Sequence, residues 1–206
     1  MTYTARKFEL PELKGLSAKQ IEVHLALYEG YVKHTNLILD TIKELRAADG
    51  SPNDKSSREK NAFVINELRR RLGFEFDGMR MHEYYFEQFE DGAKTANQNS
   101  PFAQVASERY GDWEKFVAHI KEVAGTRGIG WVVVYFDPAE RMIHTAYVGD
   151  HELGQFAGLP IILAVDMWEH AFMVDYVPAD KKKYVDAFLE NLNWSVPEKR
   201  LVEHAV

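Results

Sequence analysis

The chain contains no cysteine among its 206 residues. That absence excludes a disulfide framework, thiolate metal sites, iron–sulfur clusters and a cysteine nucleophile. A transition metal would therefore have to bind to imidazole and carboxylate groups, which suit iron, manganese or zinc. The candidates for chemistry are thus the histidines, aspartates and glutamates.

The sequence also lacks an apolar run long enough to cross a bilayer. Its first ten residues include Arg6, Lys7 and Glu9 and show no apolar stretch of signal-peptide length. We therefore expect a cytoplasmic protein with no membrane partner. The formal net charge is −7, and an acidic chain is a poor candidate for binding nucleic acid through its overall field. An anionic substrate would need a local basic surface.

The amino-terminal part shows helical periodicity. Ser17 precedes the apolar pattern, and Gln20 follows three residues later as a capping-box partner. The pattern over 21–45 predicts one long helix, or two joined by a kink. The polar segment 47–60, rich in Gly, Pro, Ser and Asn, predicts a surface loop between helices.

Two shorter helices are predicted after that loop. One covers 61–71 and is followed by Gly73, a residue that often ends a helix. The other covers 79–89, where histidine and aromatic residues share one face. An α-helical hairpin domain at residues 1–95 is the resulting prediction.

The pattern changes after the polar segment Asp91–Pro101, which we take as the domain boundary. The continuous apolar run Trp131–Phe136 predicts a buried strand. The other predicted elements are a helix at 102–123, strands at 142–148 and 159–165, and a closing helix at 184–192. The predicted fold class is α+β: the helical hairpin domain, then an α/β carboxy-terminal domain at 96–206 with a small three-stranded antiparallel sheet.

Asp166 and His170 form the strongest candidate site. Asp166 ends an apolar strand and His170 follows four residues later, so both side chains can point into one site. The competing interpretation is a helix start, with Asp166 as its cap and His170 on the surface. The spacing by itself favours that second interpretation, because an Asp-x-x-x-His match is common.

His24 and His82 each lie on an apolar helical face among aromatic residues. A buried imidazole needs a hydrogen-bond partner or a metal, so these two could complete a site of three nitrogens and one oxygen. Spacing does not show that the four groups meet. A di-iron carboxylate bundle is excluded, because no histidine has a glutamate three residues before it. The His-Glu-x-x-His zinc protease motif is also absent.

Several motifs resemble those of one known family. The run Asp166-Met-Trp-Glu-His170-Ala resembles the D-x-W-E-H-A signature of the iron/manganese superoxide dismutases. Gly128–Trp131 resembles the family's G-S-G-W, Asn193–Trp194 its N-W, and Phe8–Pro11 its amino-terminal segment. The order and spacing of these motifs match over nearly the whole chain.

The resemblance implies a metal site and a reaction. The four expected ligands are His24, His82, Asp166 and His170, holding one iron or manganese ion per subunit, with iron favoured. Alternating reduction and oxidation of that ion would convert superoxide to oxygen and hydrogen peroxide. One alternative is a metal-binding member of the fold without efficient dismutase activity; another is a helical interaction module with incidental histidines.

The resemblance also implies further site residues. Tyr31 resembles the gateway tyrosine, and Trp131 and Trp168 resemble the aromatic wall of the site. Most members hold the metal-bound solvent with a glutamine, but the second-helix position here is Gly78. His151 resembles the histidine that archaeal-type members use instead; the alternative is an exposed histidine in a hairpin turn.

Glu169 resembles the glutamate that bonds the ligand histidine of a second subunit, so we expect a homo-oligomer, dimer or tetramer, formed through Glu169 and His170. Two departures concern this region. The gateway tyrosine follows the first ligand by seven residues instead of eight, and Met173 replaces a tyrosine. Lys33 and one of residues 181–183 are candidates for attracting the anion, with a solvated basic face as the alternative.

Overall fold

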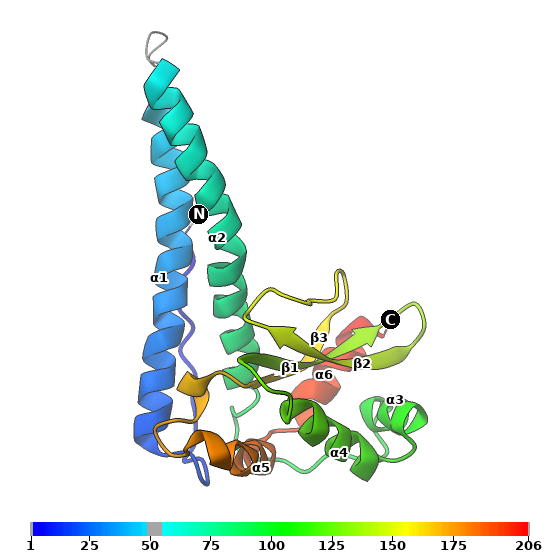
Figure 1. The fold of residues 1–206 in the computed structure, drawn as a ribbon. Helices are drawn as coiled ribbons and strands as arrows, with labels where there is room; N and C mark the ends of the chain where they lie inside the picture. Colours follow the sequence, from blue (N-terminus) through cyan, green and yellow to red (C-terminus); the bar gives the residue numbers. More distant parts are fainter. Residues whose placement is uncertain (1, 49–54, 206) are drawn as a thin grey trace.

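The computed structural model describes residues 2–48 and 55–205. Its elements, in chain order, are α1 (Ala18–Ala48), α2 (Lys55–Glu87), α3 (Pro101–Tyr110), α4 (Trp113–Ala124), β1 (Gly130–Asp137), β2 (Met142–Gly149), β3 (Ile161–Asp166), the 3₁₀ turns η1 (Glu169–Ala171) and η2 (Pro178–Asp180), α5 (Lys181–Asn191) and α6 (Ser195–His204). Helices α1 and α2 form a long hairpin, and the sheet with its helices lies beside the lower half of that hairpin (Figure 1). This arrangement confirms the α+β fold class.

Helix α1 is one continuous helix without the kink that the sequence left open. The Ser17 hydroxyl accepts a hydrogen bond from the Gln20 amide at 3.0 Å, so Ser17 caps the helix as predicted. The Gln20 side chain does not return to close a capping box, because it is buried and bonds elsewhere. The buried residues of α1 recur every three or four positions, which is the helical repeat: Gln20, His24, Tyr28, Val32, Thr35 and Ile38.

Helix α2 corrects two predictions. The helices expected at 61–71 and 79–89 are one helix that runs through Gly73. A Cβ at Gly73 would lie 2.5 Å from an oxygen of Glu152, so this glycine provides space for a neighbouring loop instead of ending the helix. The predicted loop at 47–60 is too long, because α1 and α2 take up both of its ends; residues 49–54 lie outside the described residues.

The sheet has three antiparallel strands in the order β2-β1-β3, as the fold prediction required. Strand β1 is central and almost fully buried, which its continuous apolar sequence explains. Its register pairs Trp131 with Asp166 on β3 and with Val148 on β2. Since Asp166 is the last residue of β3, the sheet delivers Trp131 and Asp166 to the same end, next to α2.

The carboxy-terminal helices differ from the prediction in two places. The single helix expected at 102–123 is broken into α3 and α4, because Gly111 has φ +102° and Asp112 caps α4 by accepting from the Lys115 amide at 2.7 Å. Helix α6 was not predicted. Its first residue, Ser195, donates its backbone N–H to Oδ1 of Asn193 at 3.2 Å. The domain boundary between residues 95 and 96 stays a prediction.

Within the described part of the chain, no helix combines the length and the apolar character needed to cross a membrane.

Candidate metal centre

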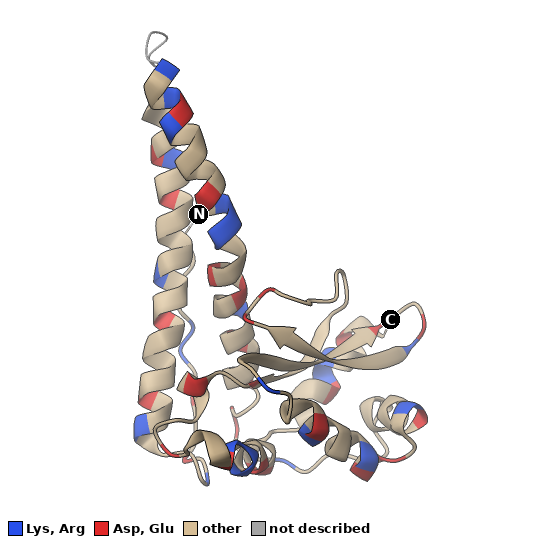
Figure 2. Cartoon of the chain, viewed as in Figure 1, with Lys and Arg blue, Asp and Glu red and all other residues tan. Residues whose placement is uncertain are grey.

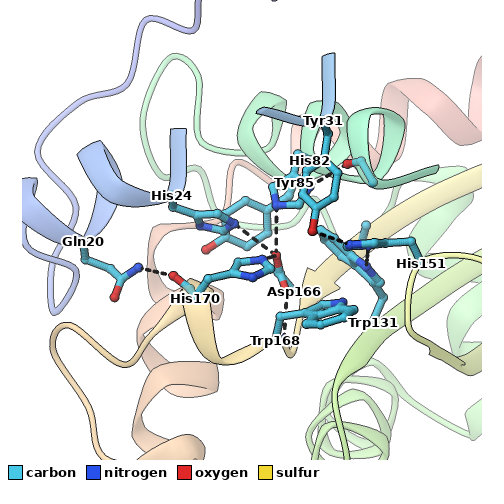
Figure 3. A network of polar contacts seen from close by, with 12 residues as sticks. Gln20, His24, Tyr31, His82, Tyr85, Trp131, His151, Asp166, Trp168 and His170 are labelled. Atoms are coloured by element: carbon cyan, nitrogen blue, oxygen red, sulfur yellow. Dashed lines mark hydrogen bonds and ion pairs between the residues drawn. The ribbon is translucent and has the colours of Figure 1, made fainter. Parts of the chain in front are cut away.

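Four side chains from separate parts of the chain converge beside the end of the sheet (Figure 3). His24 comes from α1, His82 from α2, Asp166 from the end of β3 and His170 from η1. One potential ligand atom of each lies within 4.8 Å of all the others. Three of the four residues are buried, and the side chain of His170 is 17% exposed. We call these four residues the inner cluster.

The spacing of the inner cluster fits one metal ion. Oδ2 of Asp166 lies 3.0 Å from Nε2 of both His24 and His170, and 3.5 Å from Nε2 of His82. Two donor atoms that each lie about 2.1 Å from one ion are separated by about 3.0 Å at a right angle and about 3.6 Å at 120°. Nε2 of His82 is buried and has no hydrogen-bond partner among the described residues. An unpaired buried nitrogen is costly, and a metal ion would satisfy it.

Backbone contacts fix the orientation of two residues of the inner cluster. The Nδ1–H of His82 donates to the Gly78 carbonyl at 2.6 Å, which selects the tautomer whose Nε2 is free to bind a metal. Oδ1 of Asp166 accepts from the Trp168 amide at 2.8 Å, so Oδ2 is left to face the histidines. The Asp166 carbonyl accepts from the Tyr184 hydroxyl at 2.6 Å. These contacts hold His82 and Asp166 in orientations that a metal ion could use.

Gln20 holds the backbone around His170 in place, a role that the sequence did not indicate. Its Nε2 donates to the His170 carbonyl at 2.6 Å, and its Oε1 accepts from the Val174 amide at 3.0 Å. The side-chain amide of Gln20 therefore connects the start of α1 to η1 and to the segment that follows it. A glutamine near a helix start predicts a cap, and only the tertiary structure reveals this contact.

The protonation states suit a metal. Burial lowers the pKa of His24, and burial together with neighbouring His24 lowers that of His82 well below its ordinary value. Burial acts to raise the pKa of Asp166, but the charge and hydrogen bonds of His170 and His24 outweigh it and hold that pKa far below its usual range. At neutral pH His24 and His82 are thus neutral and Asp166 is ionised, as metal ligation requires.

Comparisons with known proteins point the same way. The family description "Iron/manganese superoxide dismutases, C-terminal domain" matches residues 98–200. The "Superoxide dismutase [Fe]" of Cupriavidus metallidurans is 34% identical over 194 residues, which cover 90% of this chain and 88% of that protein. The chain belongs to the iron/manganese superoxide dismutase family.

Archaeal relatives of the family match almost the whole chain. The "Superoxide dismutase [Fe]" of Sulfolobus acidocaldarius is 26% identical over 210 residues, covering 97% of this chain and 95% of that protein. The "Superoxide dismutase [Mn/Fe]" of Aeropyrum pernix is 28% identical over 207 residues, covering 95% and 91%. The family resemblance drawn from the motifs is confirmed.

Four partly or fully buried rings contact one another beside the inner cluster of this dismutase-family protein: Tyr31, Phe74, His151 and Trp168. We call them the rim. The indole of Trp168 stacks on His151 with ring centres 4.8 Å apart and on His170 with ring centres 5.6 Å apart. The Phe74 ring meets His151 edge-on at 4.6 Å. The sequence contained no signal for Phe74.

A chain of hydrogen bonds crosses the rim. The indole N–H of Trp131 donates to Nδ1 of His151 at 2.9 Å. Burial lowers the pKa of His151 to about 4, so the ring is neutral and its hydrogen resides on Nε2. That N–H donates to the Tyr31 hydroxyl oxygen at 2.8 Å. His151 is thus buried among rim residues, which contradicts the alternative of an exposed hairpin histidine.

Gly78 determines where Tyr31 lies. A Cβ at Gly78 would be 2.6 Å from the Tyr31 ring, closer than real Cβ contacts allow. The two helices are therefore packed so tightly here that α2 has no space for a glutamine side chain at this position. The regular helix α1 presents His24 and Tyr31, seven residues apart, to the same side.

Proposed function

We propose that this protein is a superoxide dismutase whose inner cluster holds one iron or manganese ion. The observation that carries the proposal is the convergence of three imidazole nitrogens and one carboxylate oxygen within 4.8 Å, in a chain of this family. The relatives named above are dismutases. Their names do not favour the alternative of a metal-binding protein without efficient dismutase activity. Superoxide is the proposed substrate.

A bound iron or manganese ion supplies the one-electron oxidation and reduction that dismutation requires. The chain's residues set the conditions for that chemistry. Asp166 contributes the one full negative charge of the inner cluster, which favours the more highly charged state of the ion. Trp131 is buried and Trp168 stacks on two histidines, so both exclude water from the cluster.

Tyr31 is the group we assign to proton delivery. Burial, aided by the charges of Asp166 and Glu75, raises the pKa of Tyr31, so its hydroxyl keeps its proton. Because His151 donates to the hydroxyl oxygen, the Tyr31 O–H remains free to donate to a substrate. Reduction of superoxide to hydrogen peroxide takes up two protons, and a positioned hydroxyl accelerates such a transfer.

Iron is the proposed metal, supported by relatives whose names specify it. The test is to load the purified protein separately with iron and with manganese, then measure bound metal and the rate of superoxide loss. We expect about one ion per chain and the higher rate with iron. A protein that binds neither metal, or binds both and consumes no superoxide, would refute the function.

We further propose a homodimer formed through Glu169 and His170. Glu169 is exposed, and its carboxylate makes no hydrogen bond or ion pair with the described residues. A carboxylate that orients a ligand histidine of a second subunit would need this exposure. Light scattering should give twice the chain mass, and Glu169→Ala should shift the protein toward monomer. The cytoplasmic location stays a prediction, which cell fractionation would test.

A further inference from the structure

Arg71 places a positive charge on the solvent side of the rim. Its guanidinium carbon lies 3.8 Å from the centre of the Phe74 ring, close enough for a cation–π contact. The Phe74 ring in turn lies 4.6 Å from His151 and 6.1 Å from Tyr31, measured between ring centres. The Arg71 side chain is 55% exposed, so one face of it meets water and the other meets Phe74.

Glu75 is the partner of Arg71. Nε and Nη2 of Arg71 both lie 2.9 Å from Oε1 of Glu75, whose side chain is only 6% exposed. His34 approaches the other carboxylate oxygen at 3.7 Å. A buried carboxylate without its cation is strongly unfavourable. The charges of both residues act on Tyr31: the Glu75 charge acts to raise the pKa of Tyr31, and the Arg71 charge acts to lower it.

This pair matters because the proposed substrate is an anion. The chain carries a net charge of −7, so its overall field does not attract superoxide. An uncompensated Glu75 would add a negative charge beside Tyr31 at the opening of the centre. Arg71 cancels that charge, and its contact with Phe74 keeps the guanidinium in place.

We propose that Arg71 is a positioning residue that neutralises Glu75 at the rim and thereby sets the affinity of the metal centre for an anion. The proposal rests on the proposed function, because it assumes that an anion enters at the rim. It goes beyond that function by assigning to one ion pair of α2 the removal of a negative charge that would repel the anion.

Other basic groups fit this role less well. Figure 2 shows basic residues gathered midway along α2. Among them, Arg70 bonds to Glu67 on the exposed surface, through two contacts of 3.1 and 3.2 Å, and does not stack on Phe74. Lys181 donates to the Gly128 carbonyl at 3.3 Å and lines a cavity together with Gly128 and Met167, whose lining includes neither Arg71 nor Phe74. Arg70 therefore offers a matched control for Arg71.

The test compares four iron-loaded variants with the wild type: Arg71→Gln, Glu75→Gln, the double variant, and Arg70→Gln. The first readout is the affinity for azide, a small monovalent anion, measured by optical titration. The second is kcat/KM for superoxide at low and high ionic strength. Arg71→Gln should lower both about threefold to tenfold, and Glu75→Gln should raise both. In the double variant both quantities should be close to the wild-type values, and in Arg70→Gln they should equal the wild-type values.

Two features make the result decisive. The effects should shrink below about twofold at about 0.5 M salt, since salt screens partly exposed charges. A merely structural role would not give opposite signs for Arg71→Gln and Glu75→Gln. Azide affinities within twofold of the wild type in every variant would overturn the proposal. A wild-type protein that binds azide but consumes no superoxide would instead refute the function, and the order of the azide affinities would still decide the role of Arg71.

Discussion

The inner cluster and the rim lie side by side but are held in place differently. Two residues of the inner cluster are anchored by backbone groups: the Gly78 carbonyl fixes His82, and the Trp168 amide fixes Asp166. The rim is held mainly by the packing of rings, by one histidine that bridges Trp131 and Tyr31, and by a glycine that leaves space for the Tyr31 ring.

This difference separates two properties of the protein. Hydrogen bonds to backbone groups prearrange ligands, so we expect the inner cluster to determine whether a metal is bound. We expect the rim to determine what reaches the metal and how protons arrive there. Changes in the inner cluster should therefore remove the metal, whereas changes in the rim should leave it in place and alter turnover.

The largest effect should come from Asp166→Asn. The substitution keeps the shape of the side chain but removes the one carboxylate that faces the three histidines. Metal affinity should fall by at least about 100-fold, because the ion loses its only anionic ligand. Elemental analysis after dialysis measures the loss, with Asp186→Asn, on the surface of α5, as the control. Full metal content in Asp166→Asn would break the distinction between cluster and rim.

His151→Ala should have the next largest effect, in turnover and not in metal content. Without His151, Tyr31 and Trp131 lose the group that connects them. Turnover should fall about tenfold to 100-fold, and the optical spectrum and reduction potential should change. His119→Ala, on α4, is the control histidine. An unchanged rate and spectrum would remove His151 from the site.

Gly78→Ala should lower turnover about tenfold, because the new methyl group displaces the Tyr31 ring. The unfolding free energy should fall by about 1–3 kcal/mol from overpacking. Gly30→Ala is a matched helical control, since nothing lies within 4 Å of its Cβ position. Equal stability and activity in the two variants would show that the tight contact has no consequence.

Asp77→Asn should give the smallest effect, seen in pH dependence. Burial and the charge of Glu152 raise the pKa of Asp77 from 3.8 to about 6. The folded protein therefore binds the Asp77 proton more tightly than the unfolded chain does. The protonated carboxyl contributes fully to the unfolding free energy below about pH 4, and that contribution is lost as the pH rises through about 6. At pH 7.5 the melting temperature of Asp77→Asn should therefore be about 2 °C above that of the wild type, a value reduced for solvent screening. At pH 4 the two proteins should melt at almost the same temperature. Thermal unfolding of the metal-free protein measures this, and equal shifts at both pH values would contradict it.

The sequence identified the four residues that converge in the inner cluster more fully than it identified their surroundings. The D-x-W-E-H-A signature located Asp166 and His170, and the family resemblance added His24 and His82. The buried strands were recognisable because β1 is apolar at almost every position. These features are local patterns or motifs, which a single chain displays without its fold.

The missed features depend on contacts between distant segments. Gly73 looked like a helix stop, but its role is to make room for Glu152, which lies in another part of the chain. Gln20 looked like a capping residue, but its side chain bonds to His170, 150 positions away. Nothing in the local sequence around Phe74 distinguishes it from other apolar helical residues. Such roles arise from packing between elements, which periodicity does not reveal.

The most direct test of the account is a crystal structure of the iron-loaded protein with anomalous diffraction at the iron edge. The account predicts one strong peak within about 2.0–2.2 Å of Nε2 of each histidine and Oδ2 of the aspartate in the inner cluster. A peak outside the cluster, or one lacking any of the four contacts, would contradict it.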